Sequence, residues 1–597
     1  MPRLLSGAHR LRNSPLLLKL PPYLSFLCII VGVVWLFLLP LDEYSRRTYI
    51  SENALLPGQV HTYFGGSDQN VFRAFKHEIN ALADTDANST VVNDKVAEIL
   101  EDIGLKTARQ RYRYAGQGVQ GENIYSVLAA PRGDATEAIV LVASWRNGKG
   151  EINRKGVTLL LTLARYFRRW SLWSKDIIFL VTPDSAAGPQ AWVDAYHDSH
   201  TAGVESLPVK SGALQGALVI DYVKEDRFKS IHIAYDGVNG ALPNLDLVNS
   251  VVSIAGGQMG MGVGLQEMWT HRDTYRDRLE TMLRGMLKQG LGTASGAHSA
   301  FIPYHVDAVT LSPYGDGWQD EMAMGRVIEG TFRSLNNLLE KLHQSFFFYL
   351  LMSTERFVSI GTYLPSAMLV AVNFTFTSIA LWIKSGMPEA EVGKGLEGKR
   401  MDKARLGQVE RDLFLPLGVV VVVQALGVVP LGLFNATPQQ LLAPVFAIFT
   451  ILNLILPYVL SELLRTYKPT TQQYQLILSF SLLLLGMFLS TLATLNFSLS
   501  MMVGLLASPL SFVRPGSRFW AIPLALVSPP VVLGVATAVL KHGSFAAISD
   551  VLREAAFGWN VMGMYTPVIV WCVWWPAWVV GSLVVLGRPS TGKAKTA

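Results

Sequence analysis

The sequence predicts two parts: a three-layer α/β domain with a mixed, largely parallel sheet, and an α-helical membrane domain, about eight transmembrane helices in total. Three observations support this. Apolar runs long enough to span a bilayer stand near the start of the chain and crowd together in its second half. Between them, strand-like apolar runs alternate with helical patterns. The mean hydropathy of +0.30 is too high for an ordinary soluble protein.

The first apolar run, residues 22–41, is uninterrupted and about 20 residues long, which is enough to cross a bilayer. A signal peptide is the alternative, but its apolar region would be shorter and a small-residue cleavage site would follow. Instead Leu-Asp-Glu-Tyr and two arginines follow. We therefore expect an uncleaved transmembrane anchor, preceded by a cytosolic N-terminus, residues 1–21.

Residues 42–346 contain no further spanning run, and residues 347–587 form a membrane domain of about seven helices. The predicted spans are 357–383, 413–434, 441–463, 474–495, 497–513, 519–540 and 564–586, of which 497–513 is the shortest. Lys and Arg gather before the first span, in the loop 384–411, in the turns 464–473 and 514–518, and in the tail 588–597. With eight spans these segments share one side, so both termini are predicted to be cytosolic and residues 42–346 luminal.

Lys593 and Lys595 in the tail form a dilysine pattern, which predicts an address in the endoplasmic reticulum membrane; a frayed basic tail is the alternative. Both cysteines, Cys28 and Cys572, fall inside predicted spans. The luminal domain therefore folds without disulfides and has no cysteine nucleophile. Asn88-Ser-Thr is a glycosylation sequon in a polar luminal loop. The net charge of +6 follows from topology and is no signal for nucleic acid.

The luminal domain alternates strands and helices. Strands are predicted at 122–130, 138–144, 176–182, 217–223, 230–235 and 307–312, and helices at 155–169, 190–200 and 242–254. Ligands in such sheets bind beyond the carboxyl ends of the strands, where Asp221, His298 and the loop 144–150 are expected to lie. The glycine-rich stretch 256–264 is predicted to be a turning loop, because it lacks a phosphate-loop Lys. The helical pattern at 267–291 fits packing on the domain core, or a membrane surface or partner.

These strand ends resemble the M28-type aminopeptidase family. That family has Ala-His-x-Asp, Asp-Asn-x-x-Gly, a Glu-Glu pair and an Asp after successive strands, and a late His followed by Phe. At the corresponding places this chain has Ala143-Ser-Trp-Arg146, Ile152-Asn-Arg-Lys-Gly156, Thr182-Pro-Asp184, Asp221, and His298 with Phe301.

Of the ligands that the resemblance implies, only Asp221 and His298 are present. Two ligands do not hold two zinc ions, and Arg146 would repel a metal. Glu151 or Asp184 could be recruited. The sequence therefore predicts no cofactor, with Asp221 and His298 as a relic metal site that could hold one weakly bound ion. A metal-dependent amide hydrolase or synthetase of the M28 type remains the alternative function.

Three further stretches, Ser51–Val60, Leu242–Asn249 and especially Glu329–Phe348, resemble the Gaa-type subunit of GPI transamidase. The resemblance implies a multisubunit complex of the endoplasmic reticulum membrane that attaches GPI anchors to the C-termini of precursor proteins. It also implies that the nucleophilic cysteine belongs to another, caspase-like subunit. This chain would then be a non-catalytic subunit that recognises the GPI lipid and helps to assemble the others.

Lipid recognition needs an intramembrane groove with polar groups, which proline-broken spans supply. Asn373, Asn453 and Glu462 are polar residues in predicted spans, so they are candidates by default, although helix–helix hydrogen bonding is the alternative for each Asn. The resemblance points to the last span, with Pro567, Trp571 and Trp575 as further candidates. A transporter would carry inverted repeats between groups of spans, and the sequence shows none.

Overall fold

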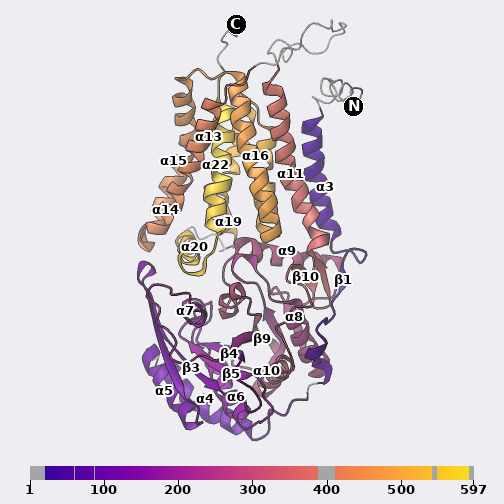
Figure 1. Cartoon of the computed structure of the whole chain (residues 1–597), viewed down its shortest axis with the longest axis vertical. Coiled ribbons are helices and arrows are strands. Elements are labelled where there is room, and N and C mark those ends of the chain that lie inside the picture. The colour runs from indigo at the N-terminus through magenta and orange to yellow at the C-terminus, as the bar shows by residue number, and fades with distance from the viewer. Residues whose placement is uncertain (1–19, 60, 86–87, 388–409, 541–546, 590–597) are drawn as a thin grey trace. The chain divides into compact units, whose positions relative to one another are not determined.

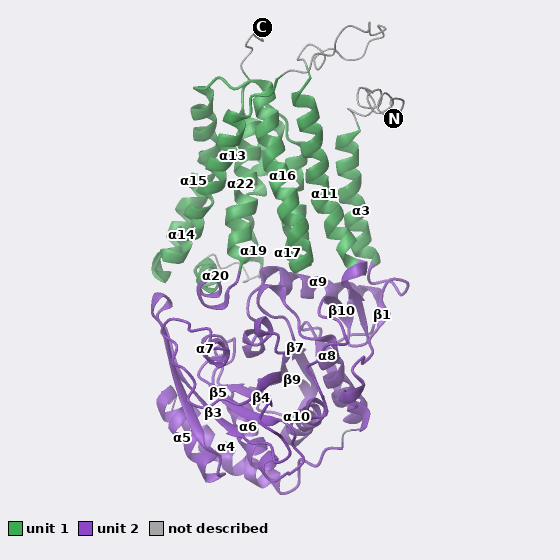
Figure 2. Ribbon diagram, viewed as in Figure 1, with its two compact units in different colours: residues 1–38, 363–556, 565–597 green, residues 39–362, 557–564 purple. Residues whose placement is uncertain are grey.

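The computed structural model describes residues 20–59, 61–85, 88–387, 410–540 and 547–589 (Figure 1). The chain divides into two compact units (Figure 2). Unit 1 comprises residues 1–38, 363–556 and 565–597, and unit 2 comprises residues 39–362 and 557–564.

Unit 2 is built on an eight-stranded sheet with the order β2-β3-β5-β4-β6-β9-β7-β8. The strands are β2 (Thr107–Tyr114), β3 (Val119–Leu128), β4 (Glu137–Ser144), β5 (Asp176–Thr182), β6 (Ala213–Ile220), β7 (Phe228–Ala234), β8 (Gly262–Leu265) and β9 (Ala308–Gln319). The central strands β5, β4, β6 and β9 pair in parallel, whereas β2–β3, β3–β5 and β7–β9 are antiparallel. The sheet is therefore mixed, as predicted. Strand β5 is buried along its whole length, which explains its continuous apolar run.

Helices cover both faces of this sheet. Helices α4 (Asp68–Asp84), α5 (Ser89–Asp102), α6 (Arg154–Arg168), α8 (Leu245–Val252) and α10 (Glu321–Asn336) contribute to the core on one face. Helix α7 (Ala187–Tyr196) and the 3-10 turn η6 (Ala297–Ala300) pack on the other. The three-layer prediction is thus confirmed. Unit 2 also contains helix α9 (Tyr275–Leu291).

Two strands of this eight-stranded sheet lie where the sequence predicts none. Strand β2 alternates buried and exposed residues and carries many polar side chains, so it has no apolar run. Strand β8 falls inside the glycine-rich stretch 256–264, which was predicted to be a loop; residues 253–258 are a π-helical turn and Gly262 begins the strand. Short edge strands need little apolar surface, which is why hydropathy misses them.

A second, three-stranded antiparallel sheet has the order β1-β11-β10. It consists of β1 (Arg46–Arg47), β10 (Tyr349–Ser353) and β11 (Arg356–Ser359). Strand β1 follows the first apolar helix closely, and β11 leads directly into the second. We call residues 46–59, which run from β1 along unit 2, the strap.

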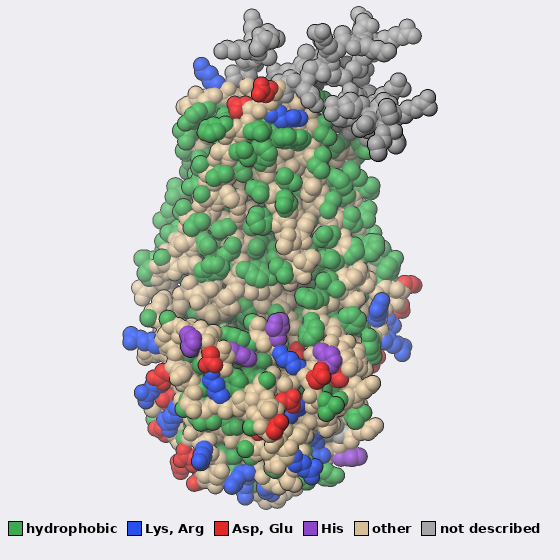
Figure 3. Space-filling model, viewed as in Figure 1, with side chains coloured by type: hydrophobic (Ala, Val, Ile, Leu, Met, Phe, Trp, Pro, Cys, Tyr) green, Lys and Arg blue, Asp and Glu red, His purple; other side chains and the backbone are tan. Residues whose placement is uncertain are grey.

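Unit 1 consists of apolar helices. They are α3 (Pro21–Leu38), α11 (Ile360–Ser385), α13 (Phe414–Leu426), α14 (Val428–Ala436), α15 (Gln439–Arg465), α16 (Thr471–Leu495), α17 (Phe497–Ala507), α18 (Ala521–Leu526), α19 (Pro529–Leu540), α21 (Thr566–Val568) and α22 (Trp575–Leu586), together with the part of α20 (Ile548–Met562) that precedes Phe557. Within the described ranges, 6 helices are long and apolar enough to cross a membrane, or up to 7 if the pair 518–526 and 529–539, bent by 43°, is one span. The side of unit 1 seen in Figure 3 is mostly hydrophobic.

Of the eight predicted spans, 497–513 is not among the long helices: it forms a shorter apolar helix, α17, extended by a 3-10 turn. Its first residue, Phe497, contacts Tyr363 at the start of α11, with ring centroids 4.6 Å apart. Ser511 donates to the Asn373 side chain in the middle of α11, and Arg514 interacts electrostatically with Lys384 at its end. This short segment therefore runs alongside α11 from one end to the other.

Candidate functional site

Asp221 and His298 lie at the edge of the sheet where the parallel strands end. Asp221 follows β6, and its N–H donates to the Leu311 carbonyl of β9 at 3.0 Å. His298 lies in η6, and its side chain contacts Thr310 of β9. Strands β6 and β9 are parallel neighbours, so these two contacts lie at the same edge of the sheet, as the fold predicts.

His298 is fully buried, and both of its ring nitrogens have partners. Nε2 lies 3.2 Å from the Asp236 carbonyl oxygen, which can only accept, so Nε2 carries the proton. Nδ1 then accepts from the Thr310 hydroxyl at 2.7 Å. Burial lowers the pKa of His298 to about 4, so the ring is neutral. A metal on either nitrogen would have to displace one of these bonds.

Asp221 has different neighbours. Its Oδ1 accepts from Asn147 Nδ2 at 3.3 Å, and the same amide donates to Glu151 at 3.0 Å. Burial raises the pKa of Asp221, and Glu151 raises it further. The loop 144–150 therefore brings Asn147 and Glu151, rather than a histidine, to Asp221.

Of the Asp-Asn-x-x-Gly motif, the Asn and the Gly are present as Asn153 and Gly156, whereas the metal-binding Asp is absent. Ile152 occupies the place of the Asp. Asn153 caps α6 by accepting from Gly156 N–H at 3.1 Å, and accepts from Tyr222 N–H at 2.8 Å. Its amide donates to the carbonyls of Ser144 and Ile220 at 3.1 and 2.7 Å. Asn153 thus joins α6 to the ends of β4 and β6.

The remaining positions of the M28-type pattern are also used internally. Ser144 accepts from the Thr182 hydroxyl at 2.9 Å. Arg146 donates to the Gly150 carbonyl at 3.1 Å. Asp184 accepts from Tyr112 at 2.7 Å and from N–H groups at the start of α7, including Ala186 at 2.8 Å. These side chains shape the loops at the sheet edge.

A dinuclear zinc centre does not fit these residues. Among the described residues, no group of three or more His, Cys, Asp or Glu could hold a metal ion. His298 has no free nitrogen, and Ile152 cannot bridge two ions. We therefore derive no chemistry through a metal at this edge.

A buried polar cluster beside His298 was missed in the sequence. Asp236 is fully buried, and its carboxylate accepts from Gln266 at 2.5 Å and from Gln289 at 3.4 Å. Its carbonyl accepts from Ser295 at 2.5 Å as well as from His298. Burial raises the pKa of Asp236. No spacing pattern links these residues, so no sequence signal could have found them.

The three stretches that carry the family resemblance meet at the strap. Asp246 is fully buried and accepts from the N–H groups of Ser51 and Glu52, the latter at 2.7 Å. Leu245 N–H donates to the Phe346 carbonyl at 3.0 Å, and Gln344 donates to the Glu52 side chain at 3.2 Å. The first stretch is therefore tied to both of the others.

Glu329 makes the corresponding contacts just beyond the strap. It is fully buried and accepts from the N–H groups of Tyr63 and Phe64, both at 2.9 Å, and from the Tyr166 hydroxyl at 3.0 Å. Arg333 lies 3.3 Å from the same carboxylate. These stretches therefore connect the N-terminal part of unit 2 to its sheet and helices.

In unit 1, Asn373 and Asn453 are buried and bonded to neighbouring helices. Asn373 Oδ1 accepts from Ser511, and its carbonyl accepts from Ser25 of α3 at 3.2 Å. Asn453 Oδ1 accepts from Trp575 Nε1 at 2.7 Å. Both therefore make the helix–helix contacts given as their alternative role. Whether either contacts a GPI lipid stays a prediction.

The last span contains a π-helical turn, η11 (Ile569–Trp574), between α21 and α22. Gln424 of α13 donates to the Cys572 carbonyl in this turn. A Cβ added at Gly427 would lie 2.5 Å from the Trp571 carbonyl oxygen, so the helices approach closely there. A π-turn displaces backbone carbonyls from the helical ladder, and Gln424 satisfies one of them.

Trp571 and Trp575 are almost fully buried. Trp571 packs on Phe434 and Phe449, with ring centroids 5.3 and 5.7 Å apart. Trp575 is held by Asn453, and Pro567 is buried in the first turn of α21. The predicted lipid contacts of these residues are untested, and in this structure both indoles lie inside unit 1.

Glu462 lies in the last turn of α15, at the end of the helix instead of its middle. Its side chain is 67% exposed and forms an ion pair with Arg465. It lines a hollow of about 290 Å³ with Arg518 and Arg588. Its surroundings are therefore charged, unlike those of the two asparagines.

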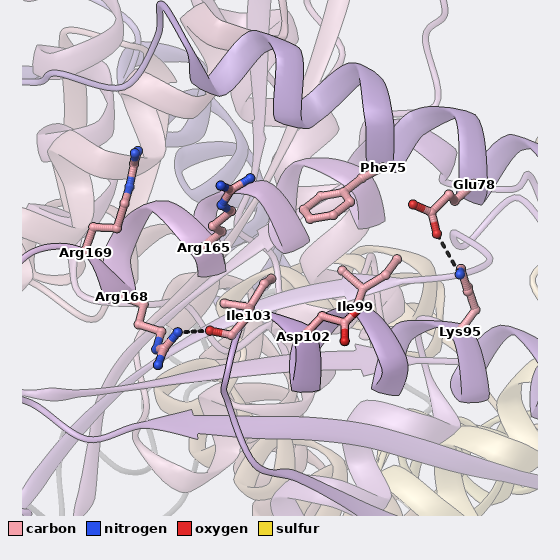
Figure 4. A pocket seen from close by; sticks show the side chains of 9 residues that line it. All are labelled: Phe75, Glu78, Lys95, Ile99, Asp102, Ile103, Arg165, Arg168 and Arg169. Atoms are coloured by element: carbon pink, nitrogen blue, oxygen red, sulfur yellow. Dashed lines mark hydrogen bonds and ion pairs between the residues drawn. The ribbon is translucent and has the colours of Figure 1, made fainter.

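A pocket of about 520 Å³ lies between α4, α5 and α6, where α6 ends (Figure 4). Its cations are largely paired: Lys95 with Glu78 at 2.7 Å, Arg169 with Asp68 at 2.6 Å, and Arg168 with the Ile103 carbonyl. It lies at the amino-terminal edge of the central strands, away from Asp221. The pocket is therefore separate from the sheet edge that carries Asp221 and His298.

The structure describes the predicted glycosylation site but not the predicted sorting signal. Asn88 is exposed and immediately precedes α5. Lys593 and Lys595 lie outside the described residues.

Comparison with solved structures gives neighbours of low similarity. Porphyromonas gingivalis glutaminyl cyclase covers 46% of this chain and 99% of its own, with 14% identity and a TM-score of 0.29. LapB from Legionella pneumophila covers 50% of this chain and 80% of its own, with 12% identity and a TM-score of 0.30.

Comparison of sequences is more decisive. A sequence model of the family described as "Gaa1-like, GPI transamidase component" matches residues 120–582. The GPI transamidase component GAA1 of Saccharomyces cerevisiae is 34% identical over 507 residues, covering 84% of this chain and 76% of the relative. The component gaa1 of Schizosaccharomyces pombe is 32% identical over 519 residues, covering 84% of each. The chain belongs to the Gaa1-like family of GPI transamidase components.

Proposed function

We propose that this chain is a non-nucleophilic subunit of a GPI transamidase, which recognises the GPI lipid and positions the other subunits in the endoplasmic reticulum membrane. One observation supports the non-catalytic role above all. At the sheet edge where an M28-type enzyme would hold its metals, His298 is neutral and bonded through both nitrogens, and Ile152 replaces a ligand. Both cysteines lie outside unit 2, so a caspase-like partner would supply the nucleophile.

The membrane part suits lipid recognition. The last span combines Pro567, a π-helical turn and a run of tryptophans, and polar side chains satisfy its freed backbone. Such a span can offer polar groups at membrane depth without exposing unpaired backbone. In this proposal unit 2 is luminal, both termini are cytosolic, and precursor proteins meet the complex on the luminal side.

Complementation with metal analysis tests the proposal. In cells depleted of the resident family member, the wild-type chain should restore a GPI-anchored surface reporter and co-purify with a cysteine-protease subunit. Asp221→Asn should restore the reporter equally well, because Asp221 binds no catalytic ion. Stoichiometric zinc in the purified full-length chain, together with loss of the reporter in Asp221→Asn at normal protein levels, would establish the metal-dependent alternative.

A further inference from the structure

Helix α9 carries a row of apolar side chains along one face. Tyr275, Leu279, Leu283, Leu287 and Leu291 stand four residues apart and form one ridge. Tyr275, Leu283, Leu287 and Leu291 remain 42%, 40%, 37% and 39% exposed. The face roughly opposite Leu287, with Thr281, Gly285 and Gln289, is buried, and the buried Met282 and Met286 lie at its border with the ridge. The helix packs on β10, so the leucine ridge is the side of α9 that does not face the core.

The N-terminal part of α9 is tied to the chain next to two membrane helices. Arg278 donates to the Pro40 carbonyl at 3.3 Å and to Asp42 at 2.6 Å. Pro40 comes two residues after the last residue of α3, a reach of about 7 Å. Asp42 also pairs with Arg356 at 2.9 Å, in the strand that leads directly into α11.

The C-terminal end of α9 is tied in the same way to the last span. Gly292, which follows the helix, accepts through its carbonyl from Asn239 N–H at 3.0 Å. The Asn239 side chain donates to the Gly563 carbonyl at 3.0 Å. Gly563 precedes α21 by three residues, a reach of about 10 Å. Both ends of this helix, about 25 Å long, are therefore held within a few residues of segments that enter the membrane.

We propose that α9 lies flat in the lipid–water interface, with its leucine ridge among the lipid headgroups and upper acyl chains. A helix held at both ends near the membrane surface is parallel to that surface, and an exposed apolar ridge gains free energy by entering lipid. Arg276, exposed on α9, can reach phosphate groups while its stem lies on the apolar surface. The inference depends only on the helix and its tethers, and holds whichever role unit 2 has in the transamidase.

Spin-label accessibility on the full-length chain tests this proposal. Both native cysteines are replaced by serine, and a nitroxide is attached to Leu283→Cys, Leu287→Cys or Leu291→Cys, with the chain in vesicles of phosphatidylcholine and phosphatidylserine. The control is Leu339→Cys, a leucine of unit 2 that is 88% exposed. All these positions are exposed, so folding is preserved. We expect collisions with water-soluble nickel chelate to fall several-fold at the three α9 positions relative to position 339, while collisions with oxygen stay high.

Each other outcome overturns the proposal. Nickel collisions equal to those at position 339 mean that the ridge lies in water. Protection from both nickel and oxygen means that protein covers the ridge.

Discussion

The buried polar residues of unit 2 mostly bind backbone. Asn153 uses all four of its side-chain hydrogen bonds on backbone groups of neighbouring elements. Asp246 binds the backbone of the strap, and Glu329 binds the backbone just beyond it. His298 fixes a backbone carbonyl and a strand hydroxyl. A sequence shows that such residues are polar, but only the structure shows that their partners are inside the protein.

Replacing His298 should reduce the acid sensitivity of the chain. Its pKa is about 4 when folded and near 6.5 when unfolded, so the unfolded state takes up the proton first. The stabilisation is complete above pH 6.5 and is lost as the pH falls towards 4, by about 3 kcal/mol. The melting temperature of purified His298→Gln should therefore fall less steeply over this range than that of the wild type. The exposed His77→Gln should keep the wild-type slope, and an equal slope in His298→Gln would contradict the assignment.

Glu329→Gln should loosen the connection between α10 and the N-terminal part of unit 2. The amide leaves buried N–H groups poorly satisfied, at a cost of about 1–3 kcal/mol. The melting temperature of the purified chain should therefore fall. Glu98→Gln, which removes an exposed ion pair worth about 0–1 kcal/mol, is the control. Equal melting temperatures in the two variants would show that Glu329 does not hold the segment at Tyr63 and Phe64.

At the scale of elements, hydropathy and periodicity predicted most of the fold. The continuous apolar runs of β4, β5 and β6 predicted central strands, and of the eight predicted spans 6, or up to 7, correspond to long apolar helices in the described ranges. Strand β2 was missed because its exposed face is polar. The π-turn in the last span was missed because nothing in the residues 569–574 distinguishes it from an α-helix; the residues that contact it, Gln424 and Gly427, lie at the end of α13 and directly after it.

Gly427→Ala should disturb the contact with this π-turn. The added methyl would lie 2.5 Å from the Trp571 carbonyl oxygen and 3.1 Å from Cys572 Cα, so one helix must move. Overpacking of this kind costs about 1–3 kcal/mol, which should appear as a lower melting temperature of the solubilised chain. Gly418→Ala, inside α13, meets no atom within 4 Å and should melt no lower than the wild type. If the two variants behave alike, the helices are less closely packed than described.

At the scale of the whole molecule, unit 1 gathers the basic segments at one end. Gln472 donates to the Ser385 carbonyl at 2.7 Å, which joins the end of α11 to the start of α16. Arg465, Arg518 and Arg588 line one hollow, which joins the ends of three more segments. Ser25 of α3 lies 2.8 Å from Thr377, so the start of α3 is near the end of α11. The sequence predicted this grouping from charge alone and showed that most M28-type ligands are absent, but it could not show that His298 is bonded through both ring nitrogens.

Glycosylation at Asn88 would report the side on which unit 2 lies. The side chain is exposed, so one glycan should be added if unit 2 is luminal. Endoglycosidase H should then shift the chain by one glycan on a gel, and Asn88→Gln should abolish the shift. Asn435 in Asn435-Ala-Thr437 is also a sequon, but it lies at the end of the membrane helix α14, so Asn435→Gln should leave the shift unchanged. The absence of any glycan on the wild type in cells that glycosylate a luminal reporter would argue against this topology.

The strap has a consequence for the order in which the protein forms during synthesis. Residues 51–64 emerge from the ribosome early, but Asp246 and Glu329, which bind their backbone, follow 195 and 265 residues later. Contacts so far apart in sequence close late. The N-terminal segment must therefore wait, unpaired and accessible to chaperones, until nearly the whole of unit 2 has been translated.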